Sequence, residues 1–457
     1  MFGRVNYIHM IGIGGIGMSG IAHILHNLGF KVSGSDLSKS EATEALNKSG
    51  IRVAVGHAKE NLMQADVVVI SSAIPHDNPE LIAARERKIP IIGRGEMLGE
   101  LMRMKYSIAV SGTHGKTTSS SMISFMLELA EFDPTSIIGG KVLEMGSNAK
   151  LGKSEYLVAE ADESDRSFLH LFPTIAVVTN IEPEHLDYYE NFDDIKSCFK
   201  QYVEKIPFYG LAILCGDDKG VGEIYADIDV RKITYGTGKS NDLRPMWMRN
   251  EGWKSRFVMK FHEKLYEFEL NLPGEHNLRN ALAAIAVGRE LKIHPDIMIE
   301  AISRFRGVRR RMERVDEVNG ILFLDDYGHH PTEILATVSS LRKVFPTQRL
   351  RVLFQPHRYS RTQHLHAEFG PAFKDATEVV LTDIYRASEK PIPGVGPELI
   401  LEAIKKDSPD TSVQLIKKRE KIIDYFCETL KPGDVFLTLG AGDVWKIGAR
   451  ILEKISS

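Results

Sequence analysis

Cysteine, net charge and long apolar runs are all scarce in this chain. Its 457 residues include three cysteines, Cys198, Cys215 and Cys427, which are odd in number and far apart. Such a set indicates neither a disulfide framework nor a zinc site, and favours a reducing cytoplasm. A net charge of −3 indicates no electrostatic attraction to nucleic acid or to an anionic membrane. No run reaches the roughly 18 apolar residues of a membrane span, and His9 and the glycines from Gly12 interrupt any signal-peptide core. We therefore expect a cytoplasmic protein that binds neither nucleic acid nor membrane.

Short apolar runs alternate with helical patterns along most of the chain. Hydrophobic content of 43% and charged content of 26% are ordinary for a soluble enzyme, and the length suits two to four domains. The pattern predicts an α/β protein of three domains. We expect a Rossmann-like N-terminal domain at 1–104, a central P-loop mononucleotide-binding α/β domain at 105–314, and a Rossmann-like C-terminal α/β domain at 315–457.

The most informative stretch is YSIAVSGTHGKTTSSS, residues 106–121. A short apolar run at 108–110 predicts a buried strand, and a helix is expected over 121–130. Strand, glycine turn and helix, with a lysine and a threonine at the helix start, form a phosphate cradle. The glycines stand three apart, closer than in G-x-x-x-x-G-K-[ST], and the alternative is a chance turn. The predicted ATP-binding residues of this loop are Gly112, Thr113, His114, Gly115, Lys116, Thr117 and Thr118.

A second glycine motif, G-x-G-x-x-G, spans 12–17 after an apolar strand. A strand at 31–34 leads to Asp36, an acid about twenty residues on, as in a dinucleotide fingerprint with the acid near the ribose. A third strand at 66–70 opens into Ser71, Ser72 and Ala73. The motif indicates a bound diphosphate and does not say that the ligand is NAD. Gly17 either contacts the ligand or serves only to let the helix pack closely against the strand.

Acidic residues follow two predicted strands of the central domain. The strand at 156–159 leads to Glu160, and the strand at 175–178 leads to a loop that contains His185. Mg²⁺ with a nucleotide needs one or two hard oxygen ligands, which Thr117 and Glu160 supply. The alternative is a set of solvated carboxylates, and His185 alone has the pattern of a helix cap.

A change of pattern marks the segment after residue 237. Runs at 256–261 and 265–270 predict a pair of antiparallel strands, a peripheral ribbon. The segment 273–280 then opens an alanine-rich helix. The amides of Asn277 and Asn280 either cap this helix or contact an adenine edge.

Arginines crowd residues 304–314, between two α/β patterns. An interdomain segment that brings an arginine to a phosphoryl group would stabilise the charge that develops during phosphoryl transfer. The alternatives are a solvated face or a nucleic-acid-binding patch. Beyond it, arginines and histidines follow two strand ends, at 325–331 and 355–361, and could bind a small carboxylate. Helix caps and surface charges are the alternative. The predicted strands of this domain are 321–324, 350–354, 378–382 and 435–439.

Six motifs occur in one order: GTHGKTT, EADESD, TNIEPEH, GEHNLRN, DDYGHHPTE and QPHRYSRT. With them the chain resembles the Mur ligase family throughout its length and in all three domains. The resemblance implies an ATP-dependent ligase of peptidoglycan precursor synthesis. It would join L-alanine to the muramyl carboxylate of UDP-N-acetylmuramate through an acyl phosphate, giving ADP and phosphate.

The resemblance also implies roles for individual residues. Lys116, His185 and Arg361 would be catalytic, and Thr117, Glu160 and His185 would hold Mg²⁺, with Mn²⁺ as an alternative. Further ATP contacts would be His276, Asn277, Asn280, Arg310 and Asp326. The UDP-substrate would be bound by Gly14, Gly15, Ile16, Gly17, Asp36, Ser72 and Ala73. The amino acid would be bound by Tyr327, His329, Arg358 and Arg361.

Two departures and several alternatives accompany this interpretation. Phe199, with Lys200 beside it, stands where some relatives carry a carbamoylated lysine, and the alanine-adding branch resembles this chain in lacking it. The loop at 385–394 retains PIPG but differs from the usual PAGE-containing form, which bears on amino-acid specificity. The alternatives are the tripeptide-adding recycling ligase of the same family, an NAD-dependent oxidoreductase, or a non-catalytic P-loop switch. We expect a monomer or a weak homodimer.

Overall fold

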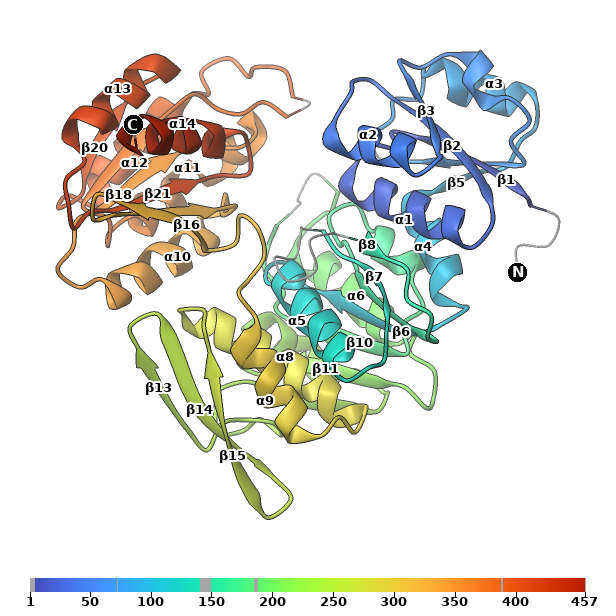
Figure 1. Cartoon of the computed structure of the whole chain (residues 1–457), viewed down its shortest axis with the longest axis horizontal. Helices are drawn as coiled ribbons and strands as arrows, with labels where there is room; N and C mark the ends of the chain where they lie inside the picture. The colour runs from blue at the N-terminus through green and yellow to red at the C-terminus, as the bar shows by residue number, and fades with distance from the viewer. Residues whose placement is uncertain (1–4, 72, 140–148, 185–187, 388, 457) are drawn as a thin grey trace. The chain divides into compact units, whose positions relative to one another are not determined.

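The computed structural model describes residues 5–71, 73–139, 149–184, 188–387 and 389–456 (Figure 1). The predicted site residues Ser72 and His185 lie outside these ranges. Contacts between residues divide the chain into two compact units, and each is described by itself. The first comprises Met1–Trp247, Val258–Phe268 and Arg279–Phe305, and the second comprises Met248–Phe257, Glu269–Leu278 and Arg306–Ser457.

The first unit begins with a five-stranded parallel sheet in the order β3-β2-β1-β4-β5. Every residue of β1 is buried, because apolar side chains of this strand pack on both faces of the sheet. The order reverses direction between β1 and β4, so the carboxyl ends of these two strands form the switch point at which such sheets bind ligands. The strands are β1 (Tyr7–Ile11), β2 (Lys31–Asp36), β3 (Arg52–Val55), β4 (Val67–Ile70) and β5 (Ile91–Gly93).

Local sequence signals set the starts of two helices around this sheet. The hydroxyl of Ser40 accepts a hydrogen bond from Thr43 N, and Asn78 followed by Pro79 begins another helix. The helices are α1 (Ile16–Asn27), α2 (Glu41–Lys48), α3 (Pro79–Glu86) and α4 (Arg94–Met102), with a 3₁₀ turn η1 (Lys59–Leu62).

The second sheet of this unit has seven strands in the order β12-β11-β10-β6-β9-β7-β8. Its pairs are parallel except for β7 with β8. Because β6 lies between β9 and β10, the loop after β6 meets the polar ends of both neighbours. The strands are β6 (Tyr106–Ser111), β7 (Thr135–Ile137), β8 (Ala149–Lys150), β9 (Tyr156–Glu160), β10 (Ile175–Val178), β11 (Leu211–Cys215) and β12 (Lys232–Tyr235).

Helix α5 (Lys116–Leu129) begins five residues before the start expected from its apolar pattern. Its first turns are polar, and most of their residues are nevertheless buried against the phosphate loop and the sheet. Hydrophobic periodicity therefore could not locate the start. The other helical segments are η2 (Ser167–His170), α6 (Phe192–Val203), α7 (Lys219–Tyr225), α8 (Glu275–Glu290) and α9 (Pro295–Arg304).

The predicted ribbon is present as β14 (Lys254–Phe261) and β15 (Lys264–Leu270), which are neighbours in a sheet. A third strand, β13 (Trp247–Glu251), extends this sheet beyond the prediction. All five of its residues are exposed, so it has no alternation of buried and exposed positions to detect.

The six-stranded sheet of the second unit has the order β16-β17-β21-β18-β19-β20. All its pairs are parallel except β16 with β17. Successive residues of its strands enter two separate apolar cores, one with α10 to α12 and the other with α13 and α14. The sheet is therefore covered by helices on both faces, as expected for a doubly wound domain.

The strands of this sheet are β16 (Glu313–Val318), β17 (Ile321–Asp326), β18 (Leu350–Phe354), β19 (Glu378–Leu381), β20 (Ser412–Leu415) and β21 (Val435–Leu439). Its helices are α10 (Pro331–Val344), α11 (Tyr359–Ala372), α12 (Pro397–Asp407), α13 (Arg419–Thr429) and α14 (Val444–Ser456). Among the described residues, no helix of either unit is both long and apolar enough to cross a membrane.

Candidate active site

The loop after β6 forms a tight turn directly before α5. Gly112 has φ +135°, and a Cβ there would lie 2.0 Å from Thr179 Oγ1, so this position accepts only glycine. Gly115, with φ +83°, is the residue before the helix, and no side chain caps its N-terminus. The first backbone N–H groups of α5 therefore lack a side-chain acceptor, which is the arrangement that a phosphate needs.

Lys116 lies folded over this loop. Its Nζ donates to Gly112 O at 2.5 Å and Thr113 O at 3.1 Å, and it lies 2.8 Å from Glu163 Oε1. Burial lowers the pKa of Lys116, but the charges of Glu163 and Asp162 outweigh it and the pKa is raised. The lysine is thus a fixed positive charge at the phosphate loop. Burial raises the pKa of Glu163 to about 7, although Lys116 opposes that shift.

The end of β10 holds the loop in shape, a role that the sequence analysis did not assign. Asn180 accepts from His114 N at 2.8 Å through its Oδ1 and donates to His114 O at 2.9 Å through its Nδ2. Thr179 Oγ1 donates to the same carbonyl at 2.6 Å, and Thr113 Oγ1 accepts from Glu182 N at 2.9 Å. The signal for these residues was their place directly after a buried strand that neighbours β6.

Two of the three predicted metal ligands lie in the described residues and are adjacent. Thr117 Oγ1 donates to Glu160 Oε2 at 3.2 Å, and Ser120 Oγ lies 3.4 Å from Glu160 Oε1. The backbone N of Gly139 donates to that second oxygen at 2.6 Å, which fixes the carboxylate. A hydroxyl and a carboxylate at the start of α5 form a hard-oxygen donor set, which fits Mg²⁺.

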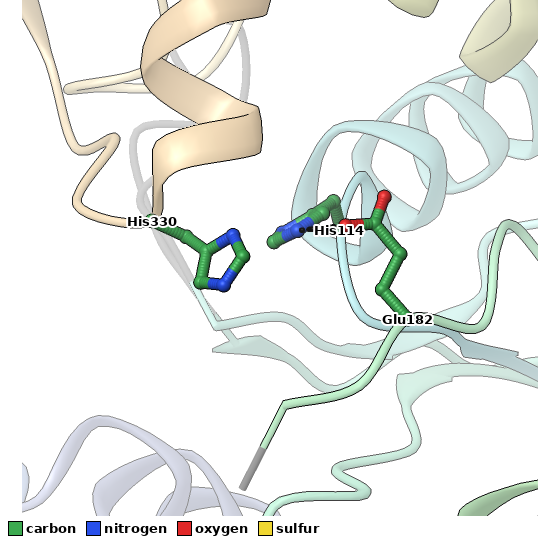
Figure 2. Close-up of side chains that lie close together, drawn as sticks. All are labelled: His114, Glu182 and His330. Atoms are coloured by element: carbon green, nitrogen blue, oxygen red, sulfur yellow. Dashed lines mark ion pairs between the residues drawn. The ribbon is translucent and has the colours of Figure 1, made fainter. Parts of the chain in front are cut away.

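His114 reaches from the phosphate loop towards Glu182, with Nε2 3.6 Å from a carboxylate oxygen (Figure 2). In the first turn of α5, Ser119 Oγ donates to Asn280 Oδ1 at 3.1 Å. Asn280 is therefore packed against the helix that begins the nucleotide loop. At the start of α8, Asn277 Nδ2 donates to Pro273 O at 2.8 Å. His276 lies beside Gly274 in the same turn.

The glycine loop of the first sheet follows β1 at the switch point. Gly12 N and Ile13 N both donate to Ser35 O. Gly14 N donates to Asp36 Oδ2 at 2.8 Å, so the Asp36 carboxylate lies on the loop itself. Ala73, after β4, faces the same switch point, and its N donates to Ser71 Oγ at 3.4 Å.

In the second unit, Asp326 and Arg310 organise the end of β17. Asp326 accepts from Met312 N at 2.7 Å and from Gly328 N at 2.8 Å, and burial raises its pKa to about 6. Arg310 donates to Asp325 Oδ2 at 3.1 Å and to Gly440 O at 2.6 Å. Both predicted ATP contacts therefore also hold the polypeptide at the carboxyl ends of β17 and β21.

Aromatic and cationic side chains gather at the ends of β17 and β18. The rings of Tyr327 and His329 meet edge to face at 5.4 Å, and His329 meets His357 at the same centroid distance. His357 stacks on Tyr385 with an interplanar angle of 10°. Arg361 Nη1 lies 3.2 Å from His357 Nδ1.

The protonation of His357 follows from these contacts. Because arginine can only donate, His357 Nδ1 accepts, and the ring proton of the neutral form lies on Nε2. Burial, aided by the charges of His329 and Arg361, lowers the pKa of His357 to about 3, so the ring stays neutral. Arg358 lies at the N-cap of α11, one turn from Arg361. Tyr385 received no role from the sequence analysis, and His357 was covered only by the general expectation that arginines and histidines after these strands bind a carboxylate.

Comparison with known proteins identifies three successive family domains. The matches are "Mur ligase family, catalytic domain" at 7–106, "Mur ligase middle domain" at 110–288 and "Mur ligase, glutamate ligase domain" at 310–442. Two similar curated relatives are the UDP-N-acetylmuramate–L-alanine ligases of Trichlorobacter lovleyi and Geotalea daltonii. They are 50% and 51% identical to this chain, over 100% of it and 100% and 99% of their own lengths.

Solved structures of similar proteins agree with this match. The UDP-N-acetylmuramate–alanine ligase of Thermotoga maritima aligns with a TM-score of 0.83 and 30% identity, over 98% of each chain. A murein peptide ligase from Psychrobacter arcticus aligns with a TM-score of 0.73 and 25% identity, over 99% of each chain. Since identity near one half extends over the whole length, the chain belongs to the Mur ligase family.

Proposed function

We propose that this protein is an ATP-dependent ligase that joins L-alanine to UDP-N-acetylmuramate in peptidoglycan precursor synthesis. The observation that carries the proposal is the identity of about 50%, over the full length, to curated ligases of that specificity. The lysine-bearing phosphate loop supports it, because a ligase of this kind must bind and split ATP. An NAD-dependent oxidoreductase would leave this loop without a role.

The reaction has two steps. A carboxylate oxygen of the muramyl group attacks the γ-phosphorus of ATP, which forms an acyl phosphate and releases ADP. The amine of L-alanine then attacks the acyl carbon, and inorganic phosphate leaves as the amide forms and the amine loses a proton. Neither step needs a covalent bond to the protein, so its contribution is positioning and charge stabilisation.

Lys116 is assigned to the charge of the transferring phosphoryl group. Its raised pKa keeps it cationic, and its Nζ already lies on the loop that would hold the phosphates. The rest of the loop, Gly112–Thr118, would bind ATP through its backbone N–H groups, with His276, Asn277, Asn280, Arg310 and Asp326 as further contacts. Thr179 and Asn180, which directly follow β10, would keep the loop preorganised.

Thr117 and Glu160, together with His185, are assigned to Mg²⁺, with Mn²⁺ as a substitute. The adjacency of the Thr117 hydroxyl and the Glu160 carboxylate supports this assignment. The ion would supply neutralisation of phosphate charge. The protein's own part is to hold the hydroxyl and the carboxylate together at the start of α5.

Arg361 is assigned to the carboxylate of L-alanine, in a pocket with Tyr327, His329 and Arg358. The neutral His357 supports this role, since it accepts one N–H of Arg361 and leaves the guanidinium its full charge. Two parallel N–H donors of a fixed guanidinium match a carboxylate. The UDP portion is assigned to the first switch point, through Gly14, Gly15, Ile16, Gly17, Asp36, Ser72 and Ala73.

We further propose domain boundaries after residues 104 and 314, a cytoplasmic location, and a monomer or weak homodimer in solution. A cytoplasmic location accords with a requirement for ATP and a UDP-linked sugar. The molar mass in solution, measured by light scattering after size exclusion, tests the oligomeric state.

Phosphate release tests the function. The assay contains ATP, Mg²⁺ and UDP-N-acetylmuramate, and single amino acids are added in turn. Release driven by L-alanine is the expected result. Release driven only by L-Ala-γ-D-Glu-diaminopimelate would assign the chain to the recycling activity, and release that ignores every acceptor would refute the ligase assignment.

A further inference from the structure

Arg94, the first residue of α4, lies between the residues assigned to the UDP portion and those assigned to the metal and ATP. A Cβ placed on Gly17, in the first turn of α1, would lie 2.7 Å from Arg94 Nη1. On its other side, Arg94 Nη2 donates to Asp162 Oδ2 at 2.9 Å. Gly17 belongs to the glycine motif of the UDP site, and Asp162 follows the metal-site residue Glu160. All of these residues belong to the first unit.

Most of the hydrogen-bonding capacity of Arg94 is unused by the described part of the chain. A guanidinium carries five N–H donors, and its contact with Asp162 is the one side-chain hydrogen bond that Arg94 makes among the described residues. The side chain is 26% exposed, so solvent or a ligand can reach it. A side chain at residue 17 would require the guanidinium to move, since a Cβ there would lie 2.7 Å from Nη1.

The glycine loop by itself is poorly equipped to bind a diphosphate. Gly12 N, Ile13 N and Gly15 N all donate to backbone carbonyls, and Gly14 N donates to the Asp36 carboxylate. Asp36 adds a negative charge to the loop. What remains is the first turn of α1, which has no acidic residue and no side-chain cap. A dianionic ligand there needs a cation to offset Asp36.

Asp162 keeps Arg94 in place and links it to the phosphate loop. Its carboxylate oxygen lies 2.9 Å from Arg94 Nη2. The next residue, Glu163, pairs with Lys116 of the phosphate loop at 2.8 Å. Packing also holds α4 in place, since a Cβ on Gly95 would lie 2.9 Å from Ser167 O of η2.

We propose that Arg94 is a further substrate-binding residue, whose guanidinium contacts the diphosphate of the UDP-linked substrate while Asp162 positions it. The alternative is a purely structural ion pair that ties α4 to the loop after β9. The inference rests on the proposed function, because it takes the glycine loop as the UDP site. It adds a cation to a set of assigned residues whose one charged member is Asp36.

The test measures binding to the full-length protein without ATP. The probes are UDP, followed by calorimetry, and uridine, followed by ligand-observed NMR. Arg94→Gln should weaken UDP binding about 10- to 100-fold, the range for a charged hydrogen bond, and leave uridine binding unchanged. Arg94→Lys should fall between, because a point charge remains without the planar donor fork.

A matched control lies on the same element. Arg103, the C-cap of α4, is an exposed arginine paired with Glu100, so Arg103→Gln should bind UDP as the wild type does. Melting temperatures of all the variants show whether they are folded, and Arg94→Lys replaces Arg94→Gln if the latter unfolds.

Three results would overturn the inference. They are unchanged UDP affinity in folded Arg94→Gln, an equal loss of UDP and uridine binding, and no binding of UDP by the wild type. The last result would also remove the proposed function. Normal UDP binding by a wild type that shows no L-alanine-dependent phosphate release would refute the function alone.

Discussion

Replacing Lys116 by methionine should separate the catalytic role of this residue from its structural one. The change keeps an unbranched side chain that is one heavy atom shorter, and it removes the charge at the phosphate loop. Preorganised electrostatic stabilisation of this kind contributes about 3–4 kcal/mol per group, or about 10²–10³ in turnover. We therefore expect kcat for L-alanine-dependent phosphate release to fall by at least about 100-fold.

The effect on stability should be much smaller. Lys116→Met leaves the buried Glu163 without its cation. Because the pKa of Glu163 is already raised to about 7, this carboxylate can take up a proton instead of remaining charged. At pH 7.5 that protonation keeps the loss from the carboxylate small, on the order of 1 kcal/mol, since one pKa unit corresponds to about 1.4 kcal/mol. The melting temperature should change by only a few degrees.

The double variant Lys116→Met with Glu163→Gln is the control. A neutral amide cannot become an unpaired charge, so the double variant should be at least as stable as Lys116→Met and equally inactive. Turnover is measured at saturating ATP and UDP-N-acetylmuramate, and stability by thermal melting. Either a loss of less than 10-fold in Lys116→Met, or recovery of a tenth of wild-type turnover in the double variant, would refute the charge-stabilisation argument.

Three other changes test further parts of the structure. Glu160→Gln should raise the Mg²⁺ concentration needed for half-maximal turnover by about 10-fold or more, because a neutral amide is a weaker ligand; an unchanged Mg²⁺ titration would contradict the metal assignment. The unfolded chain binds a proton at His357 below pH 6.5, whereas the folded one does so only below about 3. Stability should therefore fall as pH drops through that window, and His357→Gln should lose less melting temperature between pH 7 and pH 5 than the wild type; equal losses would refute the shift. Gly112→Ala should destabilise by about 2 kcal/mol or more, because its Cβ would clash with Thr179, whereas Gly222→Ala, with open space around it, should not; equal melting temperatures would refute the clash.

Strands buried on both faces were predictable where a short apolar run in the sequence marks them. The runs at 175–178, 350–354 and 435–439 match β10, β18 and β21 residue for residue. Short, nearly continuous apolar runs between polar loop residues arise when helices cover both faces of a parallel sheet. Several other strands were not predicted. The exposed strand β13 and the sheet-edge strands β16 and β20 are short, polar or alternate weakly, and neighbouring strands stabilise them. The buried strand β11 was also not predicted, although it carries the same local signal.

Motif spacing placed the phosphate loop and the glycine loop, since each needs a fixed local order of strand, turn and helix. The family resemblance added the specificity, and full-length relatives support it. None of these signals reports which side chain faces which across the sheet. The sequence could not show that the Asp36 carboxylate accepts from Gly14 N. It also could not show that Thr179 and Asn180, which follow β10, bind the backbone of His114.

The sequence alone determined the α/β class, the two nucleotide loops and the family. Each of these depends on the order and chemistry of residues that are close together in the chain. The tertiary structure alone decided which charges meet. Arg94 and Asp162 are 68 residues apart, and Lys116 and Glu163 are 47 apart. Such pairs depend on the order of strands in a sheet and on packing between helices. Their pKa values follow from burial that only the folded chain provides.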